Sequence, residues 1–227
     1  CILIAGGGAE RSPQAGETPI ENRASGAGGS VEGITIDGDL RAYQAIPYAA
    51  PPVGKLRWAP PAPPEPWVGV LAADRAGPAC MQPEGLGGEF YGETNIEMDE
   101  DCLLLNVWTR AEHQEDSLPV MVWVHGGGLL TGQGAAYPGD LLTSKGVVLV
   151  TVNYRLGRFG FFAHPELTDE HPNKVSGNQG LRDQIASLKW VRDNIARFGG
   201  DPQNVTIFGE SAGSLSMSLL QASPLAR

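Results

Sequence analysis

The chain has 227 residues, of which 41% are hydrophobic, and its formal net charge at pH 7 is −10. This length suits one large α/β domain or two small ones, and the apolar fraction is sufficient for a substantial core. The acidic balance argues against nucleic acid or an anionic membrane surface as the main partner, so we predict no nucleic-acid partner. No apolar run approaches the ~20 residues that a membrane-spanning helix requires.

The first nine residues, CILIAGGGA, form an apolar run that ends in small residues. This pattern is typical of the end of a secretory signal peptide, and we therefore expect an exported protein: secreted, periplasmic or lipid-anchored at the cell surface. Two alternatives remain open, a lipid anchor on Cys1 and an arbitrary start within a hydrophobic segment. From Glu10 to Gly29 no hydrophobic periodicity is present, which predicts a flexible lead. Residues 1–29 are therefore assigned to an export remnant and this lead.

A pair of strand-like runs and then a proline-rich stretch follow the flexible lead. Val31–Ile36 and Leu40–Ile46 are short strand-like runs around an Asp-Gly-Asp turn, and they predict a small β-hairpin. The stretch 46–67 is rich in proline, which excludes a helix or a central strand and favours extended, stiff backbone. Aromatic and aliphatic side chains alternate with these prolines. We therefore expect the stretch to pack on a folded surface, in preference to acting as a free recognition motif.

Cys80 and Cys102 enclose a stretch rich in glycine and acidic residues. The spacing lacks the paired CxxC arrangement of a zinc site, and no metal site is predicted. Two cysteines that close one loop favour a disulfide in an oxidising compartment, and two unpaired thiols are the alternative.

The second half of the chain alternates apolar runs with helical patterns. Near-continuous Val/Leu/Ile runs indicate strands that are covered on both faces, as in the central, mostly parallel sheet of an α/β fold. Apolar residues at i, i+3/i+4 spacing indicate amphipathic helices. The expected strands are 102–108, 119–124, 146–152 and 205–208, and the expected helices are 138–145, 178–198 and 211–220.

A G-x-S-x-G motif centred on Ser211 lies between the last predicted strand and the last predicted helix. A serine on a sharp strand-to-helix turn exposes its hydroxyl, and the flanking glycines let neighbouring backbone pass close. With 31 glycines in the chain the motif alone is weak evidence. Its position between strand and helix is what predicts a nucleophile for acyl transfer.

A second glycine motif, His125–Gly128, follows the strand predicted at 119–124. Consecutive glycines allow backbone N–H groups to point at a developing oxyanion, although a flexible turn has the same composition. Its position ahead of G-x-S-x-G favours the catalytic interpretation. His125 is an unsuitable base because it precedes the nucleophile. The other three histidines are expected at the surface, and Glu210 diverges from Ser211 on the turn.

Several motifs together resemble the type-B carboxylesterase family, which includes the cholinesterases and the bacterial p-nitrobenzyl esterases. The residues that carry the resemblance are Ala45–Ala49 with the PPVGKLRW run after it, Glu100–Trp108, Val124–Gly128, Asn153–Gly157 with Gly160–Phe162, Gly177–Gln184, Phe198–Pro202 and Gly209–Ser214. The resemblance implies an α/β-hydrolase fold, a small-molecule carboxylic ester substrate and no cofactor. It also implies Ser211 as nucleophile, an oxyanion hole from Gly127, Gly128 and Ala212, and a Cys80–Cys102 disulfide.

The chain departs from the family in length and at single positions. Ala45 stands where the family usually has Gly, Leu104 where an aromatic residue or Thr is common, and Leu129 where an aromatic residue often follows the glycines. Family members are considerably longer. Residues 30–227 are thus expected to be the amino-terminal part of one α/β-hydrolase domain, truncated after the nucleophile elbow. The triad acid and His are expected in the missing part, and a catalytically silent adhesion or binding relative is the alternative.

Overall fold

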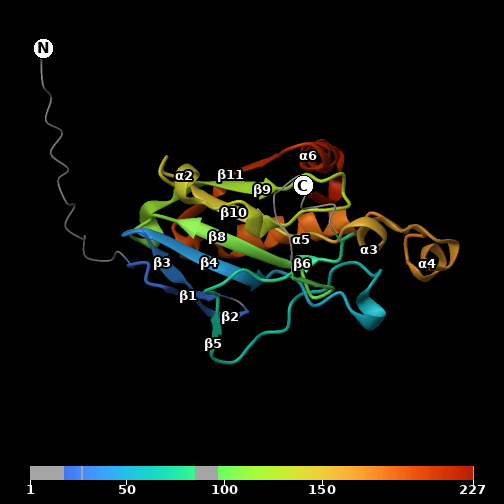
Figure 1. Cartoon of the computed structure of the whole chain (residues 1–227), viewed down its shortest axis with the longest axis horizontal. Coiled ribbons are helices and arrows are strands. Elements are labelled where there is room, and N and C mark those ends of the chain that lie inside the picture. The colour runs from blue at the N-terminus through green and yellow to red at the C-terminus, as the bar shows by residue number, and fades with distance from the viewer. Residues whose placement is uncertain (1–17, 27, 85–96, 227) are drawn as a thin grey trace, which may run out of the picture.

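The computed structural model describes residues 18–26, 28–84 and 97–226, which are built around a six-stranded sheet (Figure 1). The strand order is β11-β9-β10-β8-β4-β3. The strands are β3 (Ile34–Ile36), β4 (Leu40–Pro47), β8 (Leu104–Thr109), β9 (Leu118–Val124), β10 (Val148–Val152) and β11 (Gly200–Gly209). All four strands predicted in the second half of the chain are therefore confirmed, with shifted ends.

The prediction of a mostly parallel sheet is wrong for this part of the molecule, because the sheet is mixed. Strand β9 pairs in parallel with both β10 and β11, whereas β10–β8, β8–β4 and β4–β3 are antiparallel. Antiparallel neighbours need only a tight turn, but parallel neighbours need a crossover, usually through a helix. Within the six-stranded sheet, both the helical crossovers and the parallel pairings lie in the second half of the chain.

The predicted flexible lead is also wrong from residue 18 onward. Strand β1 (Arg23–Gly26) pairs with β2 (Gly29–Glu32), which pairs with β5 (Val70–Ala72) in a separate three-stranded sheet. Ile20 and Ala24 are each only 4% exposed. Two buried apolar side chains are sufficient to hold this segment, because β2 supplies the backbone hydrogen bonds. The segment therefore shows no hydrophobic periodicity in the sequence. Residues 1–17, where the export remnant is predicted, lie outside the described residues.

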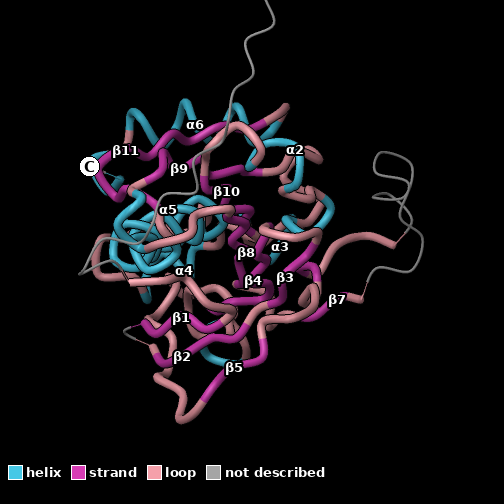
Figure 2. Tube along the Cα trace, turned by 90° about the vertical axis from the view of Figure 1, so that its left-hand side faces the viewer, coloured by secondary structure: helices cyan, strands magenta, loops and turns pink. Residues whose placement is uncertain are grey.

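The predicted hairpin is present, but its first strand is divided between two sheets. Strand β3 pairs with β4 across the predicted turn, and β2 joins the small sheet. Gly33 separates the two strands: a Cβ at this position would lie 2.3 Å from the carbonyl oxygen of Ala42. The small sheet lies at one end of the molecule and α6 at the other, at the bottom and the top of both views (Figure 1 and Figure 2).

Helices cover the two faces of the large sheet unequally. The side chains of Val120, Val122 and Val124 point to one face, where α5 and α6 pack, and Met121 and Trp123 point to the other, where α2 packs. The α-helices are α2 (Asp140–Thr143), α3 (Gly157–Phe161), α4 (Pro165–Glu170), α5 (Gln179–Asn194) and α6 (Ala212–Ala222). Shorter elements are β6 (Ala79–Cys80), β7 (Met98–Asp99) and the 3-10 turns η1 (Gly54–Leu56), η2 (Gln114–Asp116), η3 (Gly134–Ala136), η4 (Ile195–Phe198) and η5 (Pro224–Ala226).

The proline-rich stretch is packed, as predicted, and polar contacts tie it to α5. Arg155 Nη1 donates to the carbonyl oxygens of Arg57 and Ala59, both at 2.9 Å. The same guanidinium forms a buried ion pair with Asp183 of α5, at 2.7 Å. Proline has no backbone N–H to satisfy, so carbonyl oxygens dominate the polar groups of such a segment. Arg155 supplies the donors that these carbonyls need.

The structure joins Cys80 and Cys102 in a disulfide. Both residues are buried, at 2% and 1% exposed. The bond connects the end of β6 to the residues just before β8, so it fixes a peripheral loop to the large sheet. The described residues include no helix that is long and apolar enough to cross a membrane.

Candidate active site

Ser211 lies on a sharp turn between β11 and α6. Its backbone angles are φ 52° and ψ −117°, a conformation that residues with a side chain rarely adopt. Such strain costs on the order of 1–3 kcal/mol and persists only where the surrounding structure enforces it. The Gly213 N–H bonds the carbonyl oxygen of Glu210 at 2.8 Å, which closes the turn. Ser211 is exposed, so its hydroxyl is accessible.

The two motif glycines are required because α6 begins directly against the end of β9. A Cβ on Gly213 would lie 2.0 Å from the carbonyl oxygen of Val124. A Cβ on Gly209 would lie 2.7 Å from the same oxygen. Neither contact is sterically allowed, because backbone atoms cannot move aside as the end of a side chain can. The spacing of G-x-S-x-G therefore reflects two close backbone approaches that surround Ser211.

Strand pairing brings the glycine loop to this turn. Strands β9 and β11 are parallel neighbours, with Val124 opposite Gly209, so the segments that follow them emerge at the same sheet edge. A Cβ on Gly126 would lie 3.2 Å from Ser211 Cβ and 2.4 Å from Glu210 Oε2. Two motifs that are far apart in the sequence are therefore in contact. Glu210 lies with its carboxylate against Gly126.

The glycine loop turns through left-handed backbone at Gly127 (φ 93°) and Gly128 (φ 65°). Within the described part of the chain, the N–H groups of Gly127, Gly128 and Ala212 have no hydrogen-bond acceptor. The position of a Cβ on Gly128 is open space, with no atom within 4 Å. Unpaired N–H donors beside an exposed serine are suited to bind an anionic oxygen.

The two leucines that follow the glycines differ in exposure. Leu129, which stands where the family often has an aromatic residue, packs against the core, and its carbonyl oxygen accepts from the Gly157 N–H at 2.7 Å. The next residue, Leu130, is 47% exposed. The positive φ of Leu129 (62°) turns its side chain inward. Leu130 is therefore the leucine of this loop that faces solvent, a residue that the motif comparison does not single out.

His125 is fully buried and serves packing. Its ring stacks on Tyr154 with centroids 4.5 Å apart, and its Nδ1 lies 2.9 Å from the Gly126 carbonyl oxygen. The Tyr154 hydroxyl donates to the His125 carbonyl oxygen at 2.9 Å. Burial lowers the pKa of His125 from 6.5 to about 4. A ring held in this way fixes the start of the glycine loop.

The other three histidines each have a local partner. His164 is exposed and accepts from the Glu166 N–H at the start of α4. His113 and His171 are half-buried, which differs from the expected surface position, and they lie near Asp116 and Arg182 respectively. The Ser211 hydroxyl has no hydrogen-bond partner among the residues described. No cluster of His, Cys, Asp or Glu in the described ranges has the arrangement of a metal site.

Comparisons with known proteins agree with this geometry. The sequence profile of the carboxylesterase family matches residues 20–227. The chain is 51% identical over 199 residues to a fumonisin B1 esterase of Sphingopyxis macrogoltabida, covering 87% of this chain and 36% of that protein. It is 45% identical over 235 residues to carboxylesterase 1E of Mus musculus, covering 99% of this chain and 40% of that protein.

Solved structures give the same result. A thermophilic PNB esterase has a TM-score of 0.82 and 46% identity, covering 90% of this chain and 42% of that one. A Geobacillus stearothermophilus carboxylesterase has a TM-score of 0.80 and 40% identity, covering 91% of this chain and 41% of that one. The predicted α/β-hydrolase fold is thereby confirmed. The chain spans well under half the length of these relatives.

Proposed function

Because this chain belongs to the carboxylesterase family, we propose that the whole protein is a serine carboxylic-ester hydrolase with Ser211 as its nucleophile. The observation that carries the proposal is the strained, exposed turn at Ser211, held in contact with the Gly126 loop. A serine presented in this way is arranged for attack on a carbonyl carbon. The proposal involves no metal or organic cofactor.

In the proposed reaction, a His base takes the Ser211 hydroxyl proton as the oxygen attacks the ester carbonyl carbon. The N–H groups of Gly127, Gly128 and Ala212 stabilise the tetrahedral oxyanion. The alcohol leaves with the proton, an acyl-enzyme remains, and water then releases the carboxylic acid. We assign the base and its acidic partner to a part of the protein that follows residue 227. The greater length of the relatives supports this assignment.

The substrate class is proposed as carboxylic esters without further restriction. Relatives of similar identity carry the names fumonisin B1 esterase and pyrethroid hydrolase, which refer to different esters. We also propose that the protein is exported. The Cys80–Cys102 disulfide supports this, since such bonds persist in oxidising compartments.

The test is covalent labelling of the whole protein with a fluorophosphonate, together with hydrolysis of p-nitrophenyl acetate. We expect Ser211→Ala to abolish labelling and to lower kcat/KM by roughly 10³-fold or more. Ser214→Ala, at an exposed position of the same helix, is the matched control and should retain both. Labelling that persists in Ser211→Ala contradicts the assignment, and a folded protein that shows neither labelling nor hydrolysis supports the silent relative instead.

A further inference from the structure

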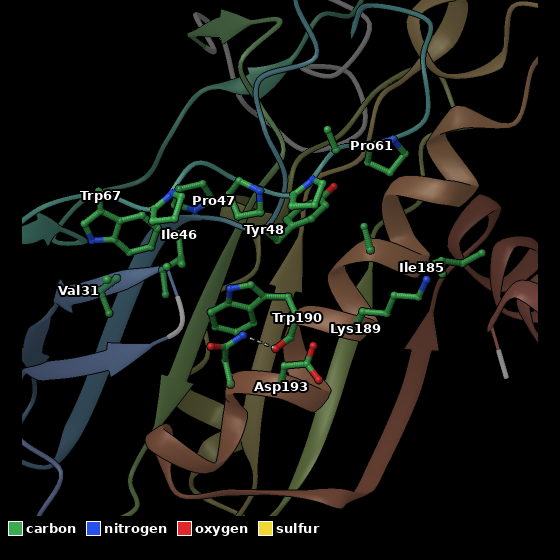
Figure 3. Close-up of a pocket in the computed structure, with 18 of the residues that line it drawn as sticks. Val31, Ile46, Pro47, Tyr48, Pro61, Trp67, Ile185, Lys189, Trp190 and Asp193 are labelled. Carbon is green, nitrogen blue, oxygen red and sulfur yellow. Dashed lines mark hydrogen bonds between the residues drawn. The ribbon is translucent and has the colours of Figure 1, made fainter. Parts of the chain in front are cut away.

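A cavity of about 600 Å³ lies between the proline-rich stretch, the three-stranded sheet and α5 (Figure 3). Trp67, Ile46 and Tyr48 lie along one side, and Trp190 lies opposite them on α5. None of the residues that line the cavity belongs to the Ser211 turn or to the glycine loop. The volume is within the range of about 300–1,000 Å³ that is usual for small-molecule sites.

The apolar walls are held in place independently of any ligand. Ile46 and Tyr48 are 1% and 3% exposed and belong to the main core. The Trp67 indole N–H donates to the Ser30 carbonyl oxygen at 2.7 Å, which fixes its ring against the small sheet. The stiff backbone of the proline-rich stretch forms one wall of the cavity. The space is therefore pre-formed, and the protein loses little conformational entropy when a ligand binds there.

The charge around the cavity has the opposite sign to that of the chain. The protein carries 26 acidic and 16 basic residues. The cavity lining nevertheless includes Arg182, Lys189 and Arg197, with Asp193 as the acidic member. Asp193 is already paired with Arg192 at 2.7 Å. Among the described residues, the three cations form no ion pair with a carboxylate.

The helix places two of these cations on one face. Arg182 and Lys189 are two helical turns apart on α5, with the apolar lining residues Ile185 and Ala186 between them. Lys189 is exposed and is bound to no described partner, so its ammonium group is available at the rim. An apolar cavity with an unneutralised cationic rim is complementary to a molecule with an apolar body and one anionic end.

We propose that this cavity is a second, non-catalytic site that binds an amphiphilic carboxylate, such as a medium-chain fatty acid. The hydrocarbon chain lies between Trp67 and Trp190, and the carboxylate lies at the rim against Lys189. The proposal is independent of the Ser211 chemistry, because none of the cavity residues takes part in it.

The experiment measures binding of dodecanoate, below its critical micelle concentration, to the 227-residue chain by isothermal titration calorimetry. Tryptophan fluorescence is a second readout, since Trp67 and Trp190 line the cavity. We expect Lys189→Glu to weaken dodecanoate at least tenfold. Lys145→Glu makes the same charge change at an exposed lysine outside the cavity and should leave affinity within twofold. Dodecyltrimethylammonium should bind at least tenfold more weakly than dodecanoate.

A cavity-filling variant tests whether dodecanoate binds in this cavity or elsewhere on the chain. Ala186→Phe places a ring in the space that Ala186 lines, and it should abolish dodecanoate binding while circular dichroism shows an intact fold. Absence of dodecanoate binding to the unmodified chain overturns the proposal. So does binding that survives both Lys189→Glu and Ala186→Phe, since the ligand then occupies another place, the Ser211 turn included.

Discussion

At the scale of single residues, the Ser211 turn depends on positions where no side chain fits. Gly213 and Gly209 let α6 begin against the Val124 carbonyl oxygen, and Gly126 lets the glycine loop lie against Ser211. The G-x-S-x-G motif contains Gly209 and Gly213, so the sequence marks where a side chain is absent. The carbonyl oxygen that both glycines approach belongs to Val124 of β9, which the motif does not include.

Gly213→Ala tests this close approach. The added Cβ would lie 2.0 Å from the Val124 carbonyl oxygen, so β9 and α6 must separate. We expect the free energy of unfolding to fall by about 2–4 kcal/mol, measured by urea denaturation followed by circular dichroism. Ser214→Ala, one residue further along and exposed, should change it by less than about 0.5 kcal/mol. Equal urea midpoints for Gly213→Ala and Ser214→Ala would show that the close approach of Gly213 to Val124 does not contribute to the stability of the fold.

His125 predicts a pH dependence of stability. Its pKa is lowered to about 4 in the folded protein, whereas an unfolded histidine titrates near 6.5. Between pH 4 and pH 6.5 the unfolded state binds one more proton at this residue than the folded state does. The stability that neutral, buried His125 contributes to the folded state is therefore complete above pH 6.5 and is lost as the pH falls toward 4. At ~1.4 kcal/mol per pH unit, the loss from this residue between pH 7 and pH 5 is about 2 kcal/mol.

The measurement is urea denaturation at several pH values for the unmodified chain and for His125→Gln. The glutamine does not titrate, so the stability of the variant should fall less steeply between pH 7 and pH 5, whatever its absolute value. If both proteins lose stability in parallel across this range, another group is responsible.

At the scale of the elements, a buried ion pair joins segments that are distant in sequence. Arg155 follows β10, Asp183 lies in α5, and the carbonyl oxygens of Arg57 and Ala59 belong to the proline-rich stretch. The side chains of Arg155 and Asp183 are 2% and 0% exposed. The spacing of apolar residues predicts α5, but it does not indicate that Asp183 is buried. Asp183 is buried because Arg155 neutralises it, which only the assembled fold reveals.

Arg155→Met tests the tie between these elements. It leaves Asp183 buried without a counter-charge, and we expect a loss of about 3–5 kcal/mol in the free energy of unfolding. The double variant Arg155→Met with Asp183→Leu should recover a large part of this loss, since no uncompensated charge remains. Arg192→Met breaks an ion pair that is exposed on both sides and serves as the control, with little or no expected change. A double variant no more stable than Arg155→Met alone would contradict the charge-burial explanation.

At the scale of the whole molecule, the described chain ends its sheet on an open edge. Strand β11 pairs only with β9 among the described residues, and Leu215 and Leu219 of α6 are 54% and 44% exposed. An unpaired edge of this kind is an attachment point for further strands. This edge lies beside the Ser211 turn, so whatever extends the sheet there also borders the site.

The isolated 227-residue chain is expected to hydrolyse p-nitrophenyl acetate at the background rate. No histidine follows Ser211 in the chain, and each of the four that precede it lies against a partner of its own. A serine without a base is a weak nucleophile. The measurement compares the purified chain with its Ser211→Ala variant. Turnover that is well above background and lost in that variant would mean that the chain contains a complete catalytic apparatus.

The sequence by itself determined the strands of the second half, the helix at α5, the elbow motif and the glycine loop. These features depend on the spacing of apolar residues and on local backbone requirements. Both can be read from residues that are close together in the sequence. Only the tertiary structure decided that Arg23–Gly26 forms a strand, that the sheet is mixed, and that Leu130 is more exposed than Leu129. Strand pairing and burial are set by partners that are distant in the chain. The contact between Gly126 and Ser211 has the same origin, in the parallel pairing of β9 with β11.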